Sequence, residues 1–299
     1  AGYGVNYTTV YRNNGGTFTN LNFTLPNANY YLTPTDLAWL DVDGDGDADL
    51  AESCWILSGY QPVTYRFRNN FPTNTFTSIS TNLPGIGVTN IADGAMAWAD
   101  YDNDGDLDVF LAGDTNTYHT PDAFSALYRN DRGVFTNSGI VFPALVRGAA
   151  VWGDYDNDGN LDLLLAGQTG SAATNSITKL YRNNGNGTFT DSGASFPGVT
   201  DCALAFGDLD NDGDLDLFIG NYVGWSPELD LEVNNQLVGG GRAYGRPWNF
   251  PGTFPHLYRN DSVRGKTRFV EITAGSGLQV KNPATGVPIA KTLAVAPID

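Results

Sequence analysis

Four nine-residue segments of the chain concentrate carboxylate side chains at alternating positions. They begin at Asp41 (DVDGDGDAD), Asp100 (DYDNDGDLD), Asp154 (DYDNDGNLD) and Asp208 (DLDNDGDLD). Nineteen of the 33 acidic residues lie in these segments. Carboxylates held this close repel one another unless a cation neutralises them. We therefore interpret the segments as cation-binding loops, because ordinary solvated turns would not need so many acids.

The order of residues within each loop favours Ca²⁺. Side chains at positions 1, 3, 5 and 9, with a backbone carbonyl at position 7, supply the all-oxygen shell that Ca²⁺ prefers, whereas Mg²⁺ demands tighter octahedral geometry. Glycine at position 6 permits a bend with positive φ, and the residue at position 8 is apolar. An EF-hand differs, since it closes with Glu at position 12 between two helices. We predict about four bound Ca²⁺ ions, one for each loop. The candidate metal residues are Asp41, Asp43, Asp45, Asp47, Asp49, Asp100, Asp102, Asp104, Asp106, Asp108, Asp154, Asp156, Asp158, Asn160, Asp162, Asp208, Asp210, Asp212, Asp214 and Asp216.

Short strands must position these loops, because each loop belongs to a longer repeat. The loop starts are 59, 54 and 54 residues apart, and two further markers recur in step, one of the form LYRNN and one of the form TFT. A small and apolar segment precedes each loop, and a compact apolar run such as LDLLLAG follows it. Such runs are typical of strands buried on both faces. Four short strands in each repeat of this length predict the blade of a β-propeller.

The repeats predict an all-β chain that forms a single β-propeller domain over residues 1–299. Complete four-stranded blades are expected at about 37–80, 95–140, 149–194 and 203–273, and an insertion is expected at 222–256. Residues 5–24 resemble the last two strands of another blade, and residues 290–299 resemble a first strand. The two ends could share a partial fifth blade, or the chain could be part of a longer propeller. The sequence leaves both possibilities open.

The motifs resemble FG-GAP/VCBS repeats, the calcium-binding blades of integrin α-subunits and of many secreted bacterial proteins. The resemblance rests on DxDxDGxxD followed by LLLAG and by LYRNNGNGTFTD, and it covers roughly residues 5–299. Residues 221–261 also resemble an insertion of ASPIC-type proteins, which are similar to cartilage acidic protein. This resemblance implies an extracellular location, bound calcium, and adhesion or ligand binding.

The insertion supplies the candidate ligand-binding residues. Aromatic and arginine side chains in loops on a rigid scaffold are typical of binding sites, although such an insertion could equally cover an exposed core edge. The candidates are Trp225, Arg242, Tyr244, Arg246 and Trp248. Catalysis is not expected, because His119 and His256 are the only histidines and neither lies in a catalytic motif. Cys54 and Cys202 are the only cysteines, and they are expected to be free thiols or a single bridge.

Composition narrows the expected partners. The formal net charge of −17 argues against nucleic acid, whose binding requires a basic face, and no apolar run is long enough for a membrane span. The chain starts at Ala1 without a Met, which is consistent with export after removal of a signal peptide or with a fragment. We expect a secreted or cell-surface module that binds a protein or glycan ligand or further copies of itself. A calcium-dependent lectin is the alternative.

Overall fold

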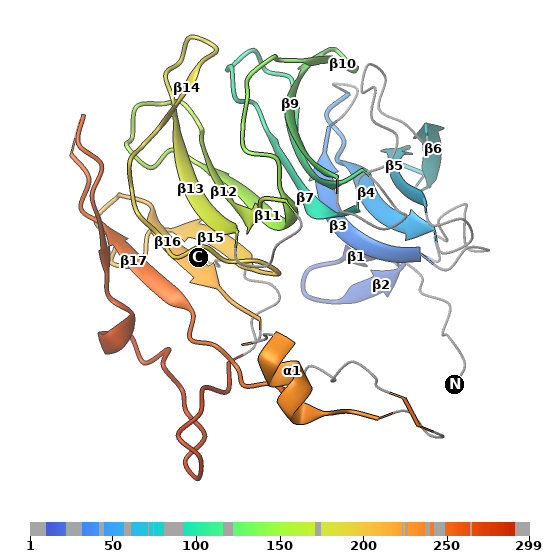
Figure 1. The fold of residues 1–299 in the computed structure, drawn as a ribbon. Helices are drawn as coiled ribbons and strands as arrows, with labels where there is room; N and C mark the ends of the chain where they lie inside the picture. The colour runs from blue at the N-terminus through green and yellow to red at the C-terminus, as the bar shows by residue number, and fades with distance from the viewer. Residues whose placement is uncertain are drawn as a thin grey trace.

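The structure is a computed structural model of the 299-residue chain. It describes residues 10–21, 32–41, 45–56, 61–70, 72–73, 75–80, 92–115, 122–170, 175–222, 224, 227–236, 240–241, 249–263 and 265–290. Within these ranges the regular secondary structure is almost entirely β-strand (Figure 1).

Four antiparallel sheets of four strands each form the body of the molecule. In every sheet the strands are hydrogen-bonded in chain order, so each sheet is a simple meander. The first sheet contains β3 (Leu32–Leu40), β4 (Asp49–Ile56), β5 (Gln61–Asn69) and β6 (Phe76–Ser80). The second contains β7 (Ala92–Ala99), β8 (Asp108–Asp114), β9 (Ala123–Asp131) and β10 (Val134–Asn137). The third contains β11 (Val146–Gly153), β12 (Asp162–Gln168), β13 (Ser176–Asn183) and β14 (Phe189–Asp191). The fourth contains β15 (Ala203–Gly207), β16 (Asp216–Gly220), β17 (His256–Asn260) and β18 (Phe269–Glu271). The prediction of an all-β chain of four-stranded units is confirmed.

The first strands of the four sheets lie next to one another in the order of the sequence. β3 contacts β7, β7 contacts β11, and β11 contacts β15 (Figure 1). The second strands, β8 and β12, are buried along nearly their whole length, as the continuous apolar runs predict.

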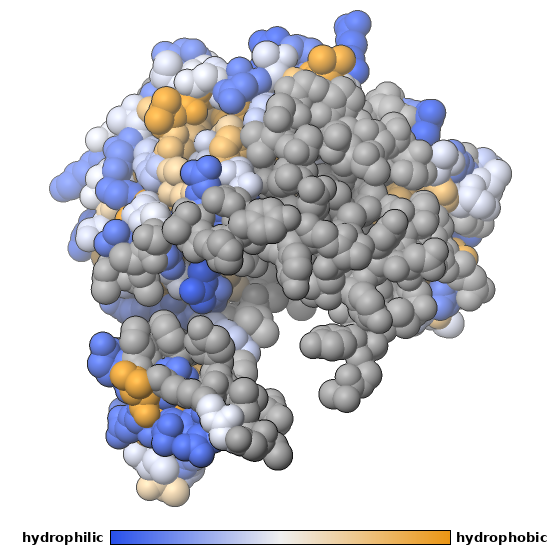
Figure 2. Space-filling model, turned by 45° about the vertical axis from the view of Figure 1, so that its right-hand side comes forward, coloured by the Kyte–Doolittle hydropathy of each residue, from blue (hydrophilic) through white to orange (hydrophobic). Residues whose placement is uncertain are grey.

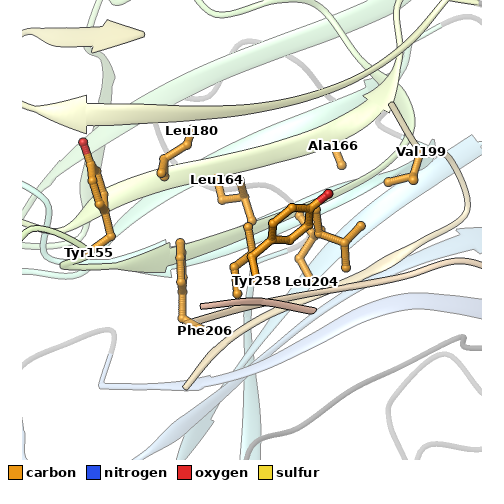
Figure 3. Close-up of a cluster of buried hydrophobic side chains, with 10 residues drawn as sticks. Tyr155, Leu164, Ala166, Leu180, Val199, Leu204, Phe206 and Tyr258 are labelled. Carbon is orange, nitrogen blue, oxygen red and sulfur yellow. The ribbon is translucent and has the colours of Figure 1, made fainter. Parts of the chain in front are cut away.

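Hydrophobic cores fill the spaces between the second and third sheets and between the third and fourth sheets. One core joins the second and third sheets through residues such as Phe110, Leu127 and Leu163. Another joins the third and fourth sheets, where Leu164 and Leu180 pack with Tyr258 and other side chains (Figure 3). Apolar area buried in this way stabilises the packing by about 25 cal/mol per Å². These sheets are therefore held face to face by hydrophobic contact. The first strand of each sheet lies at the sheet edge that is next to the first strand of the neighbouring sheet.

Of the segment before the first sheet, the structure describes residues 10–21, which form a two-stranded hairpin of β1 (Tyr11–Asn13) with β2 (Phe18–Asn20). Its residues are exposed, including 56% of Tyr11 and 66% of Phe18. The rest of the proposed partial blade, including residues 291–299, lies outside the described residues.

Helical structure in the described part of the chain is short. It comprises α1 (Pro227–Val233), within the expected insertion, the 3₁₀ helix η2 (Thr273–Gly275) and a 3₁₀ residue at Asn249. None of these is long and apolar enough to cross a membrane. Cys202 carries a free thiol, and burial raises its pKa to about 12.

On the face shown in Figure 2, the described surface is largely hydrophilic, and the hydrophobic residues appear in small separate patches.

Candidate metal-binding loops

Each acidic loop joins the first and second strands of its sheet. The loop begins with the Asp that follows the first strand, and the Asp at position 9 is already the first residue of the second strand, as at Asp49, Asp108, Asp162 and Asp216. This placement puts the loops at the end of each first strand. Because the first strands are neighbours, the loops gather on one side of the molecule.

The carboxylate at position 1 organises the turn. Its two oxygens accept hydrogen bonds from the backbone N–H groups at positions 5 and 6. In the second loop the Asp100 oxygens lie 3.0 Å from the nitrogen of Asp104 and 2.9 Å from that of Gly105. The same pair of bonds forms at Asp41, Asp154 and Asp208. At position 5, Asp104 accepts a further bond from the N–H at position 7.

The glycines at position 6 adopt the positive φ that the sequence predicts, from 88° at Gly159 to 96° at Gly105. A second left-handed residue, which the sequence had not led us to expect, stands at position 4 of three loops. Asn103, Asn157 and Asn211 have φ values of 59°, 54° and 60°. Asparagine tolerates this conformation better than most residues with a side chain, so its recurrence at position 4 was the available signal.

The carboxylate at position 9 is buried and locks the loop to its sheet. Asp108 accepts one hydrogen bond from the N–H of Tyr101 at 3.0 Å and another from the N–H of Asn130 at 2.8 Å. The equivalent pair is present at Asp162 and at Asp216. Burial raises the pKa of Asp108 and of Asp162 to about 7. The ionised form of each group is therefore destabilised in the metal-free fold.

Three of the loops bring their carboxylates at positions 1, 3 and 9 together. In each, ligand atoms of the three residues lie within 4.8 Å of one another. The clusters are Asp100 with Asp102 and Asp108, Asp154 with Asp156 and Asp162, and Asp208 with Asp210 and Asp216. The side chains at positions 5 and 7 are not part of these clusters. In the first loop, Asp43 lies outside the described residues.

One carboxylate oxygen of the third cluster has no partner within the protein. The Asp156 side chain is only 9% exposed, and its Oδ1 is buried with no hydrogen-bond partner. A buried carboxylate oxygen without a partner is costly, and it stands in a cluster of three acids. Burial and the charge of Asp104 likewise raise the pKa of Asp102. The donor set is all oxygen and strongly anionic, which suits a hard divalent cation. These clusters are able to hold metal ions.

Adjacent loops are hydrogen-bonded to each other, a feature that the sequence gave no means of predicting. The amide of Asn103 donates to the carbonyl of Gly159 in the next loop at 3.4 Å, and that of Asn157 donates to Gly213 at 3.3 Å. Asn157 also donates to the carboxylate of Asp214 at 2.7 Å. The second, third and fourth loops therefore form a connected row.

The residues predicted to bind a ligand in the insertion, Trp225, Arg242, Tyr244, Arg246 and Trp248, lie outside the described residues, so that assignment stays a prediction. His256 begins β17, and its Nδ1 lies 2.9 Å from Glu271 Oε1 on β18. This cross-strand contact gives His256 a structural role within the fourth sheet.

Fold and loops together define an all-β repeat protein whose four-stranded units each carry an acidic loop between the first two strands. Residues 100–165 and 154–219 match the family model described as FG-GAP-like repeat. The chain therefore contains FG-GAP-like repeats over residues 100–219, and the resemblance noted in the sequence is confirmed there.

A search of curated proteins found no match to the chain. Among solved structures, a chain of the complex described as "Cryo-EM structure of RAG in complex with one melted RSS and one unmelted RSS" is similar over 80% of this chain and 70% of that chain. The sequence identity is 12% and the TM-score is 0.40. Similarity at this level supports no conclusion about function.

Proposed function

We propose that the chain is a calcium-binding β-propeller domain that acts as an extracellular interaction or structural module. The observation that carries this proposal is the set of three-carboxylate clusters on neighbouring loops, one of which holds the unpartnered oxygen of Asp156. Ca²⁺ is the metal we propose because it accepts many oxygen ligands in flexible geometry, whereas Mg²⁺ retains its waters.

The role that we propose for the metal is structural. Each loop closes the first two strands of a unit, so neutralising its carboxylates contributes to the folding free energy. Extracellular calcium is millimolar, and it would saturate sites with dissociation constants of about 10⁻⁴ M. Partners would then bind to loops presented by a calcium-stabilised scaffold, without catalysis by the domain.

Calcium counting and thermal melts test this proposal. We expect native mass spectrometry to show about four ions per chain and chelation by EDTA to lower the melting temperature substantially. Asp156→Ala should reduce the count by about one ion, since repeat units are stabilised locally. A chain that binds no calcium, or whose melting temperature is the same with and without EDTA, would contradict it.

Self-assembly is a further part of the proposal, and the exposed hairpin β1–β2 supports it. Tyr11 and Phe18 are more than half exposed on the two-stranded hairpin that the structure describes within residues 10–21, whereas the four described sheets have four strands each. An exposed sheet edge can pair with a strand of another copy. Light scattering on a gel-filtration column should therefore detect oligomers. A monomer alone at micromolar concentration would argue against assembly.

A calcium-dependent lectin is the second candidate, and one cavity favours it. This cavity has a volume of about 430 Å³ and lies between the third and fourth sheets beside the third acidic loop. Its lining includes Lys266, Asp191 and Ser192, which can donate or accept hydrogen bonds from sugar hydroxyls. Binding on a glycan array that disappears with EDTA and with Lys266→Ala would support a lectin. An array without signal in calcium buffer would exclude it.

A further inference from the structure

The arginine that follows each acidic loop in the sequence has one of two kinds of partner. In the second and fourth sheets it pairs with the Asp that comes two residues later in the sequence, where the same strand ends. Arg129 lies 2.7 Å from Asp131, and Arg259 lies 2.6 Å from Asp261. In the third sheet, Arg182 instead reaches the acidic loop, where its Nε lies 2.6 Å from Asp156 Oδ2 and its Nη2 is bonded to Asp158.

The arginine of the first sheet also contacts an acidic loop, as the arginine of the third sheet does. Arg68 of the first sheet lies 3.2 Å from Asp45 at position 5 of the first loop. The four arginines therefore divide into two pairs, one bonded to a loop and the other bonded to a nearby Asp.

The two pairs differ in sequence at one position of the repeat, the second residue after the arginine. Arginines that bond to Asp131 and Asp261 belong to RND sequences, whereas the two that reach a loop belong to RNN sequences ending in Asn70 and Asn184. The side-chain amide of Asn184 donates to the hydroxyls of Thr188 and Thr190, at 3.0 and 2.9 Å. An Asp cannot donate such bonds, because an ionised carboxylate is an acceptor only. The carboxylate of an Asp at this position therefore remains available to pair with the arginine.

The amide of Asn70 is used in the same way as that of Asn184. It donates to Thr77 Oγ1 at 2.8 Å across the turn between β5 and β6. The Asn oxygen remains a weak alternative for the arginine, since Arg182 Nη1 lies 3.5 Å from Asn184 Oδ1. With no carboxylate beside it, the guanidinium takes the strongest acceptors within reach, which are the loop acids.

We propose that Arg182 is a tethered counter-cation of the third acidic loop, and that the residue after the Arg-Asn pair sets the calcium affinity of each loop. The inference rests on the proposed calcium-binding function and specifies how that function is tuned. Asp131 and Asp261 hold the guanidinium groups of their arginines out of direct contact with the second and fourth loops, so that those arginines act on the loop carboxylates only through longer-range electrostatics. Asn184 leaves Arg182 on Asp156 and Asp158, so Ca²⁺ must displace the guanidinium or bind beside it.

The consequence is a difference in affinity and in metal dependence between loops of nearly identical sequence. A like charge within a few Å disfavours a bound cation, and a shift of one order of magnitude or more is typical of such contacts. We therefore expect the third loop to bind Ca²⁺ about tenfold more weakly than the second and fourth. Arg182 should also keep that loop ordered without metal. The partnerless Asp156 Oδ1 remains for the cation.

A calcium titration followed by NMR resolves the loops individually. The full chain is labelled with ¹⁵N-glycine, and the amide signals of Gly105, Gly159 and Gly213 are followed, because each donates to the position 1 carboxylate of its own loop. In the wild-type chain, Gly159 should reach half-saturation at about tenfold more calcium than Gly105 or Gly213.

Reciprocal substitutions then test the cause. Asn184→Asp and Arg182→Gln should each move the Gly159 midpoint to lower calcium, and Asp131→Asn should move the Gly105 midpoint to higher calcium. In the Arg182→Gln background, Asn184→Asp should add little, because there is no arginine left to withdraw. Thr190→Val is the matched control, since it removes a turn hydrogen bond without adding charge and should leave the Gly159 midpoint unchanged. Circular dichroism at saturating calcium confirms that each variant is folded.

The outcomes separate this inference from the proposed function. If none of the three glycines responds to calcium, the calcium-binding proposal fails and this inference fails with it. If all three titrate at the same calcium concentration, calcium binding stands and only the tethered counter-cation is rejected. An equal effect of Asn184→Asp with and without Arg182 would also reject it, since added negative charge alone would then explain the shift.

Discussion

The side-chain amide of Asn183 donates a 2.8 Å hydrogen bond to the backbone carbonyl of Tyr101, which belongs to the acidic loop of the preceding sheet. The same amide donates to the carbonyl of Leu161 in its own loop at 3.2 Å. Asn260 repeats the arrangement one unit later, with Tyr155 and Leu215. In the third and fourth sheets, one buried side chain thus ties its own loop to the preceding one.

Asn183→Ala should destabilise the chain by roughly 2 kcal/mol, because it leaves two buried carbonyl groups without their donor. Urea unfolding followed by fluorescence would measure the difference in unfolding free energy between the wild-type chain and the variant. Asn186→Ala serves as the control, since Asn186 is exposed and bonds only within its own turn, and its substitution should change the unfolding free energy by less than about 0.5 kcal/mol. Equal effects of the two substitutions would contradict a role for Asn183 between sheets.

Asp102→Asn should have effects of opposite sign with and without calcium. Burial and the charge of Asp104 raise the pKa of Asp102, so its ionised form is unfavourable in the metal-free fold. Removing that charge should raise the melting temperature in EDTA. In calcium buffer the same substitution removes a ligand and should lower it. Thermal melts of the wild-type chain and of Asp102→Asn, each in EDTA and in calcium buffer, measure the two changes in melting temperature. A lower melting temperature of the variant in EDTA would contradict the expected effect of the Asp102 charge on the metal-free fold.

The metal-free chain should lose stability as the pH rises from about 4 to about 7. Burial raises the pKa of Asp108 and Asp162 to about 7, well above the ordinary 3.8. The folded chain therefore binds more protons than the unfolded chain in this window, and stability falls as those protons are released. Calcium requires the ionised carboxylates, so the stabilisation by calcium should grow over the same window. Melting temperatures in EDTA and in calcium across this range provide the check; a steady rise in EDTA would count against it.

Gly153→Ala should destabilise the contact between the third and fourth sheets. A Cβ at Gly153 would lie 2.6 Å from the ring of Phe206 and 3.2 Å from Leu215, and overpacking of this kind costs about 1–3 kcal/mol. Gly275→Ala is a suitable control, because a Cβ there meets nothing within 4 Å. Chemical unfolding of both variants tests the prediction, and a neutral Gly153→Ala would show that the Phe206 ring can move aside.

Much of the repeat unit could be predicted from the sequence because its signals are local. Continuous apolar runs identified strands such as β8 and β12, and the glycine at position 6 identified the bend, whose φ at Gly105 is 96°. The all-β class and the FG-GAP-like repeats of residues 100–219 follow from the same markers.

Contacts between units were beyond the reach of the sequence. The LYRNN marker recurs along the sequence, but the partner of its arginine in the third sheet, Arg182, depends on which acceptors the fold brings near it. Likewise, the bond from Asn183 to Tyr101 joins residues 82 positions apart. Such partners are decided by how one sheet packs on the next.

The row of hydrogen-bonded loops has a consequence for how the chain responds to its surroundings. Because Asn103 and Asn157 each join one loop to the next, an ion that orders one loop also orders a contact of its neighbour. Calcium bound at the second or the fourth loop should therefore strengthen binding at the third loop between them, although the third loop still fills last. The row would then become rigid in stages as calcium rises, with its outer members ordered before its middle.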